Sequence, residues 1–206
     1  MDELPLFRRD VLEALRGPLE DGVVQVVRSG GSVTFPCRFS LVAAMNPCPC
    51  GYGEEGALCP CSPSAVRAYR ARISGPLMDR FDLHLTMTRL RAADLMRERE
   101  GEPSATIRER VEHARSIQRE RYRAAGATNA AVSKRTLLLA GRFRPEAYEQ
   151  LHGAIDEYRL TGRGTDRVLR VARTVADLRG SEHVGPGDVV SALGFRYVEE
   201  READAA

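Results

Sequence analysis

Four of the five cysteines lie close together, as Cys48-x-Cys50 and Cys59-x-Cys61, with an eight-residue loop between the pairs. Four thiolates at about 2.3 Å satisfy a tetrahedral Zn²⁺ ion and leave no open position, so such a site is structural. A redox pair and four buried thiols without a partner are the alternatives. In a cytosolic protein, clustered cysteines indicate metal or redox chemistry before disulfides, and we favour zinc. The intervening loop contains three glycines that allow it to fold back: Gly51, Gly53 and Gly56.

Three further positions carry groups suited to nucleotide chemistry. Asp2-Glu3 is an acidic pair of the kind that holds Mg²⁺ on a nucleotide and polarises water when it follows a strand. Asn46 ends an apolar run, where ligands of open α/β sheets gather, and Arg80 follows a Gly-Pro break. Each has a plainer interpretation: a surface acidic pair, a turn residue before Pro47, and an arginine paired with a neighbouring aspartate.

The first half of the chain mixes helix and strand patterns. We expect a helix over residues 7–15, closed by Gly17-Pro18, and a hairpin over 23–35 with its turn at Ser29-Gly30-Gly31. The apolar run at 39–45 is typical of a buried parallel strand. Ser62-Pro63 can cap a helix through residue 72, and alternation at 81–85 predicts a short strand.

The second half reads as helices only, which the apolar spacing places at residues 105–123, 145–158, 165–178 and 186–193. The fold class is therefore α/β up to about residue 90, joined to an all-α domain. A parallel sheet of two strands cannot cover itself, so we expect its first strands to lie upstream of Met1.

Composition excludes several classes. The 31 basic and 29 acidic residues leave a formal net charge of +2, which is neither a polycationic tail nor an acidic disordered chain. No apolar run approaches the roughly 18 residues of a membrane span, and the N-terminus is too polar for a secretion signal. We expect a soluble, cytoplasmic protein with no membrane partner.

The order of these features resembles one family. The segment DELPLF, a helix, a hairpin, a strand ending AAMNPCPCG and then ISGPLMDRFDLH are together similar to the Mg-chelatase-like AAA+ ATPases, in particular their ComM/YifB branch. The resemblance extends from Asp2 to about Phe195. It implies a truncated AAA+ P-loop NTPase core followed by an all-α lid domain.

The resemblance also implies roles. Asp2 and Glu3 match the Walker B pair, with Asp2 on Mg²⁺ and Glu3 as the catalytic carboxylate, and Asn46 matches sensor 1. Arg80 matches the arginine finger that acts on ATP held by the adjacent protomer. TGRGTDRVLRVARTVADL matches the sensor 2 helix. Within that helix Arg163 is the first choice for the phosphate contact and Arg167 the second, while two later arginines, Arg170 and Arg173, are expected to pair with acidic neighbours.

One departure from the family is large: the 206 residues contain no GxxxxGK[ST] phosphate loop. We therefore expect a C-terminal fragment that begins inside the Walker B motif and does not hydrolyse ATP alone. Its expected parts are the ATPase core over 1–90, the helical lid with sensor 2 over 91–198 and a disordered tail over 199–206.

Three functions fit the pattern. The first is a hexameric, ATP-dependent DNA motor resembling a branch-migration helicase of natural transformation. Its hairpin matches the pre-sensor-1 hairpin, and Arg28 at the hairpin turn contacts DNA phosphates or is simply exposed to solvent. The second is a chelatase-type ATPase subunit that assists Mg²⁺ insertion into a porphyrin. The third is a zinc-stabilised nucleic-acid-binding module without a motor, which requires Met1 to be the true start.

Overall fold

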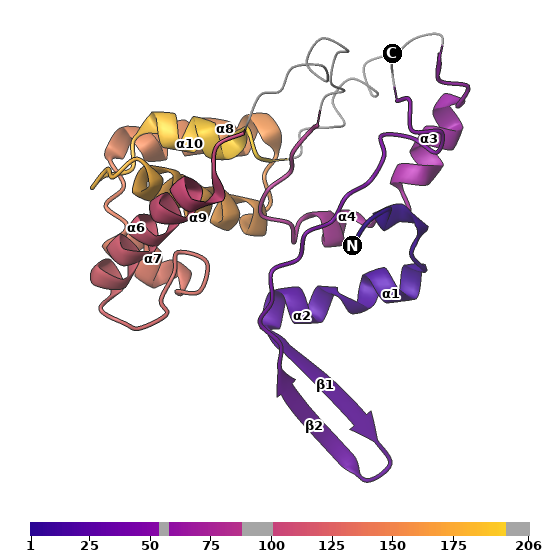
Figure 1. Cartoon of the computed structure of the whole chain (residues 1–206), viewed down its shortest axis with the longest axis horizontal. Coiled ribbons are helices and arrows are strands. Elements are labelled where there is room, and N and C mark those ends of the chain that lie inside the picture. Colours follow the sequence, from indigo (N-terminus) through magenta and orange to yellow (C-terminus); the bar gives the residue numbers. More distant parts are fainter. Residues whose placement is uncertain (54–57, 88–100, 197–206) are drawn as a thin grey trace. The chain divides into compact units, whose positions relative to one another are not determined.

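The computed structural model describes residues 1–53, 58–87 and 101–196, and it divides into two compact units, Met1–Phe81 and Asp82–Ala206 (Figure 1). Each unit is described by itself. The domain boundary expected at residue 90 and the tail expected over 199–206 both lie outside the described residues. No described helix is long and apolar enough to cross a membrane.

The first unit begins with three short helical segments. A 3-10 turn, η1 (Leu4–Leu6), is followed by α1 (Arg9–Ala14) and α2 (Arg16–Asp21). The helix predicted over 7–15 is present as α1, but Gly17-Pro18 does not end the helical segment, because α2 contains both residues. Proline is tolerated in a first helical turn, where its missing N–H has no intrahelical partner. The helix ends instead at Gly22, whose φ of 65° is left-handed.

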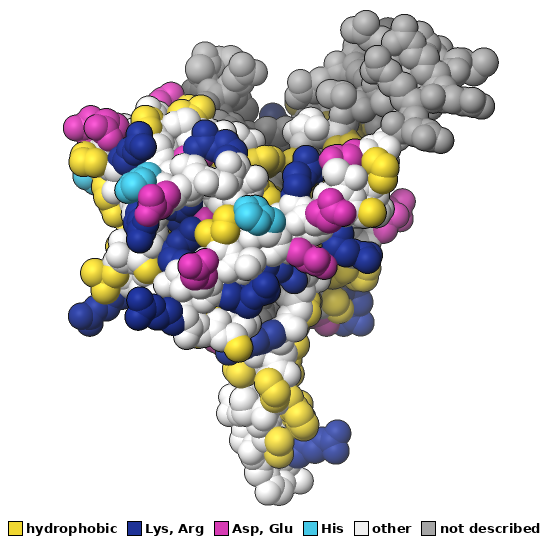
Figure 2. Space-filling model, turned by 60° about the vertical axis from the view of Figure 1, so that its left-hand side comes forward, with side chains coloured by type: hydrophobic (Ala, Val, Ile, Leu, Met, Phe, Trp, Pro, Cys, Tyr) yellow, Lys and Arg dark blue, Asp and Glu magenta, His cyan; other side chains and the backbone are white. Residues whose placement is uncertain are grey.

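The hairpin is confirmed as β1 (Val23–Arg28) and β2 (Gly31–Pro36), paired antiparallel from Val23 opposite Pro36 to Arg28 opposite Gly31. Pro36 therefore stands at the open end of the ladder and does not interrupt it. Figure 2 shows hydrophobic side chains along this hairpin and a basic side chain near its tip. Since residues opposite one another share a face, Val24, Val26, Val33 and Phe35 lie on one side together.

The strands expected at 39–45 and 81–85 are wrong as assigned elements, since β1 and β2 form the one sheet of the described residues. The 39–45 segment nevertheless pairs with the start of the chain. Met1 N donates to Val42 O at 2.6 Å, Ala44 N to Met1 O at 2.9 Å and Leu4 N to Ala44 O at 2.9 Å. This exchange is the hydrogen-bond pattern of two segments that run in the same direction. The short contact keeps the parallel arrangement without forming a continuous sheet.

Two more helices complete the unit, α3 (Pro63–Arg70) and α4 (Gly75–Met78). The predicted Ser62 cap is confirmed, because its side chain accepts a hydrogen bond from Ala65 N at 3.2 Å. The core is a small cluster of buried side chains contributed by η1, α1 and the residues around α4: Leu4, Leu12, Ile73 and Leu77. This cluster joins the chain start to the segment after α3.

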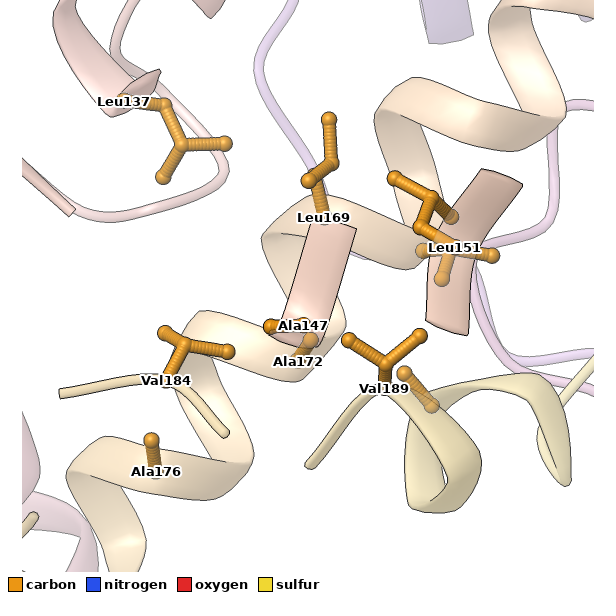
Figure 3. Close-up of a cluster of buried hydrophobic side chains, with 10 residues drawn as sticks. Leu137, Ala147, Leu151, Leu169, Ala172, Ala176, Val184 and Val189 are labelled. Carbon is orange, nitrogen blue, oxygen red and sulfur yellow. The ribbon is translucent and has the colours of Figure 1, made fainter. Parts of the chain in front are cut away.

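The described part of the second unit is helical. It contains α6 (Ser104–Tyr122), α7 (Lys134–Ala140), α8 (Pro145–Tyr158), α9 (Gly162–Leu178) and α10 (Pro186–Leu193). The four predicted helices are confirmed, although α9 begins at the Thr161 cap and not at Thr165. Helix α7 was not predicted, although Ser133 caps it. The apolar faces of α7 to α10 meet in one core around Leu137, Leu151, Val168 and Val189 (Figure 3).

A buried carboxylate organises the polar contacts of this unit. Asp177 is fully buried in α9 and accepts hydrogen bonds from Arg121 at 2.9 Å and Asn129 at 2.8 Å. It also pairs with Arg173 at 3.0 Å. Burial lowers the pKa of Arg173, and the charge of Asp177 opposes that shift. One carboxylate therefore compensates two cations removed from water.

Replacing this carboxylate is expected to destabilise the helical unit strongly. Asp177→Ala leaves Arg121 and Arg173 without their counter-charge, and breaking a buried pair costs about 3–5 kcal/mol. Urea unfolding followed by circular dichroism measures the loss. Asp156→Ala, at an exposed position of α8, is the matched control and is expected to change the unfolding free energy by about 0.5 kcal/mol or less. Equal effects of the two substitutions contradict the assignment.

Candidate functional site

The four clustered cysteines converge in space. Their Sγ atoms all lie within 4.8 Å of one another, and Cys48 Sγ is 3.3 Å from Cys50 Sγ and 3.7 Å from Cys59 Sγ. Four sulfurs placed about 2.3 Å from a central Zn²⁺ are separated by roughly 3.8 Å. The arrangement therefore fits a tetrahedral four-thiolate site. No disulfide joins the cysteines, all five of which are free.

The loop that follows Asn46, described up to Gly53, is shaped by glycine. Gly53 has a φ of 65°, and a Cβ atom there would lie 2.9 Å from the Pro47 ring. Its N–H donates to Cys48 Sγ at 3.2 Å. Gly51 is also left-handed, with a φ of 84°. The prediction that glycines allow the loop to fold back is thus supported at these two positions, and Gly56 lies outside the described residues.

The surroundings of the clustered thiols shift the pKa values of Cys48 and Cys59 in opposite directions. Burial opposes ionisation of Cys48, but hydrogen bonds from Cys50 and the Gly53 amide lower its pKa to about 6. For Cys59 a backbone hydrogen bond with Cys61 favours the thiolate, but burial and the neighbouring sulfurs raise its pKa to about 12. A bound divalent cation would replace the protons that these sulfurs share.

A pocket of about 480 Å³ lies beside the cysteine cluster. Its polar lining includes Glu3, Asn46 and Arg72, and its remaining wall comes from η1, the cysteine loop and α3 through Leu6, Pro49, Ala65, Ala68 and Tyr69. Glu3 and Asn46, which are 43 positions apart in sequence, thus share one cavity. The contact between Met1–Leu4 and residues 42–44 brings them together.

The two acidic residues differ in placement. Glu3 lines the pocket, and its φ of 49° is left-handed, an uncommon conformation for a residue with a Cβ atom. Asp2 is exposed, and its Oδ1 accepts a hydrogen bond from Glu3 N at 2.9 Å. The Asp2 carboxylate therefore helps to hold the backbone turn that directs Glu3.

Tyr69 and Arg72 are polar pocket residues that the sequence did not predict. Tyr69 is buried in α3, and burial raises the pKa of its phenol. The charges of Glu3 and Cys48 add to this rise, whereas a backbone hydrogen bond with Asn46 and the charge of Arg72 oppose it. The pKa of this one phenol therefore depends on Glu3, on the backbone at Asn46 and on the cysteine cluster.

Arg80 lies elsewhere in the same unit and is buried. Its guanidinium donates to Arg16 O at 3.0 Å, to Pro76 O at 2.5 Å and to the Glu20 carboxylate. Glu20 is 60 positions away in sequence, so this ion pair was not predicted. As the structure stands, Arg80 ties α2 to the residues before it in α4.

The two predicted phosphate-contacting arginines belong to the other unit. Arg163 is exposed in the first turn of α9, and Arg167 follows one turn later with an ion pair to Asp82. Two other arginines of α9 behave as predicted: Arg170 pairs with Asp166 at 2.7 Å and Arg173 with Asp177 at 3.0 Å.

Arg28 is exposed at the end of β1, opposite Gly31 at the hairpin turn. It is the one charged residue of the hairpin strands.

Comparisons with known families account for both halves of the chain. The profile of magnesium chelatase, subunit ChlI, matches residues 1–95, and that of the ChlI C-terminal region matches residues 101–196. The chain therefore belongs to the Mg-chelatase-like AAA+ family, as the motifs around Asn46 and Arg80 indicated.

Curated relatives extend the similarity over nearly the whole chain. An uncharacterized protein of Mycobacterium tuberculosis is 42% identical over 98% of the chain and 40% of the relative. Competence protein ComM of Haemophilus influenzae is 39% identical over 95% of the chain and 38% of the relative. Uncharacterized protein YifB of Escherichia coli is 36% identical over 97% of the chain and 39% of the relative. The chain thus spans about 40% of the length of the curated relatives that it matches.

Removing one cysteine of the cluster is expected to abolish stable metal binding. Cys59→Ser leaves three thiolates. The number of zinc ions per chain, measured by inductively coupled plasma mass spectrometry, should fall from about one to well below one. Cys37→Ser removes a cysteine outside the cluster and is the matched control, expected to retain the metal. Unchanged zinc content in Cys59→Ser would falsify the four-thiolate site.

Proposed function

We propose that this chain forms part of an ATP-dependent DNA motor, in which residues 1–90 belong to the ATPase core and residues 91–198 form the helical lid. The observation that carries the proposal is that Glu3 and Asn46 line one pocket in a chain of the Mg-chelatase-like AAA+ family. A carboxylate and an amide placed together can orient a water molecule against a phosphate. The similarity to a competence protein favours DNA as the substrate.

The proposed roles come from the resemblance to the family, and the chemistry of each side chain suits its role. Asp2 holds Mg²⁺, Glu3 polarises the attacking water, and Asn46 holds that water or a γ-phosphate oxygen. The 206 residues contain no phosphate loop, so the β- and γ-phosphates need one from outside them. Arg163, with Arg167 as second choice, contacts the nucleotide from the sensor 2 helix.

Assembly as a hexameric ring gives Arg80 its function. An arginine that reaches ATP on an adjacent protomer neutralises charge in the transition state. In this structure Arg80 is held by Glu20 and two carbonyl groups. The neighbour's phosphate must therefore compete with Glu20, which makes the contact dependent on assembly.

The second candidate is a chelatase-type subunit that couples ATP hydrolysis to Mg²⁺ insertion into a porphyrin, favoured by both matching family profiles. A third, a zinc-stabilised nucleic-acid module without a motor, uses only the cysteine cluster and the hairpin. Stimulation of ATP hydrolysis by DNA supports the motor. ATP hydrolysis that depends on a porphyrin-bound partner supports the chelatase, and DNA binding without hydrolysis supports the module.

Glu3→Gln is expected to stop ATP hydrolysis without preventing ATP binding. In the complete polypeptide encoded at this locus, loss of the catalytic carboxylate should lower kcat by about a hundredfold or more, because water activation contributes roughly 10²–10⁴-fold. Phosphate release measures kcat, and a fluorescent ATP analogue measures binding. Glu109→Gln makes the same chemical change at an exposed position of α6 and should retain full activity. Full activity of Glu3→Gln excludes this role.

Arg28→Ala is expected to weaken DNA binding by the same polypeptide. Loss of one phosphate contact should reduce the slope of log affinity against log salt by about 0.9 for duplex DNA, with little dependence on sequence. Fluorescence anisotropy at several salt concentrations measures this slope. Arg108→Ala, at an exposed position of α6, is the control. Identical slopes for both variants place the hairpin tip in solvent.

A further inference from the structure

Arg72 supplies the basic group in the lining of the pocket that contains Glu3 and Asn46. Its side chain is exposed, and within the described residues no hydrogen bond or ion pair engages its guanidinium. Arg80 is the opposite case, since its three guanidinium contacts are made inside the protein. Of these two arginines, Arg72 is the one whose charge faces the pocket.

Two buried residues near Arg72 hold its backbone on the pocket wall. They are Tyr69, three positions before Arg72, and Ile73, directly after it. Ile73 belongs to the same core cluster as Leu4, which directly follows Glu3. The backbone positions of the acidic and basic pocket residues are therefore coupled through one apolar contact cluster.

The cysteine cluster positions two other parts of the pocket wall, the segment at Asn46 and helix α3. Cys48 follows Asn46 by two positions, and Cys61 directly precedes Ser62, the cap of α3. Arg70 Nε donates to Pro47 O at 3.3 Å, which adds a direct link between α3 and the segment after Asn46. A site that binds all four sulfurs thus also fixes the distance between Asn46 and the helix that leads to Arg72.

The charges of the pocket determine what it can accept. Glu3 alone repels a phosphate, and the Asn46 amide is neutral. A guanidinium on the same wall offsets the carboxylate and offers a planar set of donors that matches phosphate oxygens. A polyphosphate ester is therefore better matched to the three residues together than to the predicted pair alone.

We propose that Arg72 is a phosphate-contacting residue that acts on nucleotide bound in its own chain, in addition to the contact assigned to Arg80 across a protomer boundary. The proposal rests on the proposed ATPase function. It differs from that function in naming a second basic group, from the same chain, at the pocket of Glu3 and Asn46.

The test is ATP hydrolysis by the complete polypeptide carrying Arg72→Gln. We expect kcat/KM to fall by about tenfold to a hundredfold, because a charge-assisted contact to the transferring phosphate is lost. Arg72→Lys keeps the charge but not the planar donors and should recover part of the loss. Arg67→Gln is the matched control: Arg67 is exposed on the same helix, α3, but is not part of the pocket lining, so activity should be unchanged. Equal activity of Arg72→Gln and Arg67→Gln overturns the proposal.

A second measurement separates this inference from the ATPase function itself. Pyrophosphate is titrated into the 206-residue chain while the arginine side-chain Nε–H signals are followed by nuclear magnetic resonance. The signal of Arg72 is identified as the one that is absent from the spectrum of Arg72→Gln. A shift of this signal on addition of pyrophosphate supports the contact, even if the complete polypeptide does not hydrolyse ATP. Hydrolysis by the wild type with no effect of Arg72→Gln, and no such shift, rejects Arg72 while leaving the ATPase function standing.

Discussion

The parallel hydrogen bonding between the first four residues and residues 42–44 is the constraint on which the candidate site depends. Three backbone bonds, between Met1 and Val42, Met1 and Ala44, and Leu4 and Ala44, place Glu3 beside the segment that ends at Asn46. The three bonds join main-chain atoms, whereas the side chains of Glu3 and Asn46 are exposed. The site is therefore built by main-chain pairing, and its polar side chains follow from the register of that pairing.

The cysteine cluster acts on the same pocket from the other side. Two chain segments converge on it, one that follows Asn46 and one that leads into α3. Gly53 permits this convergence because a side chain there would collide with Pro47. A four-thiolate metal would thus stabilise the spacing of the pocket walls without taking part in any reaction, as expected of a site with no open coordination position.

Local signals predicted much of the fold. The Ser62 cap, the hairpin with its glycine turn, and the helices opened by Pro145 and Pro186 all follow from residues close in sequence, and the structure has each of them. The cysteine spacing predicted the cluster for the same reason. The apolar run at 39–45 failed as a strand because pairing with Met1 and Leu4 is too short to extend into a sheet. An apolar run in the sequence does not by itself show how many neighbouring strands a segment pairs with.

The arginines show what sequence cannot supply. Arg80 stands in the ISGPLMDRFDLH motif, yet its partner Glu20 lies 60 positions away and the pairing depends on tertiary packing. Arg72 belongs to no recognised motif, yet packing of Ile73 against the Leu4 cluster sets it at the pocket. A motif indicates which residues have a role in the family. Whether the charge of a residue is accessible to a ligand depends on its burial, which the motif does not show. In the proposed assembly, an arginine already satisfied by internal acceptors can reach a neighbouring protomer only by exchanging partners, and that exchange requires a ligand whose phosphate competes with Glu20. The exposed arginine needs no such exchange, so the two groups would respond to different events, one to nucleotide and one to assembly.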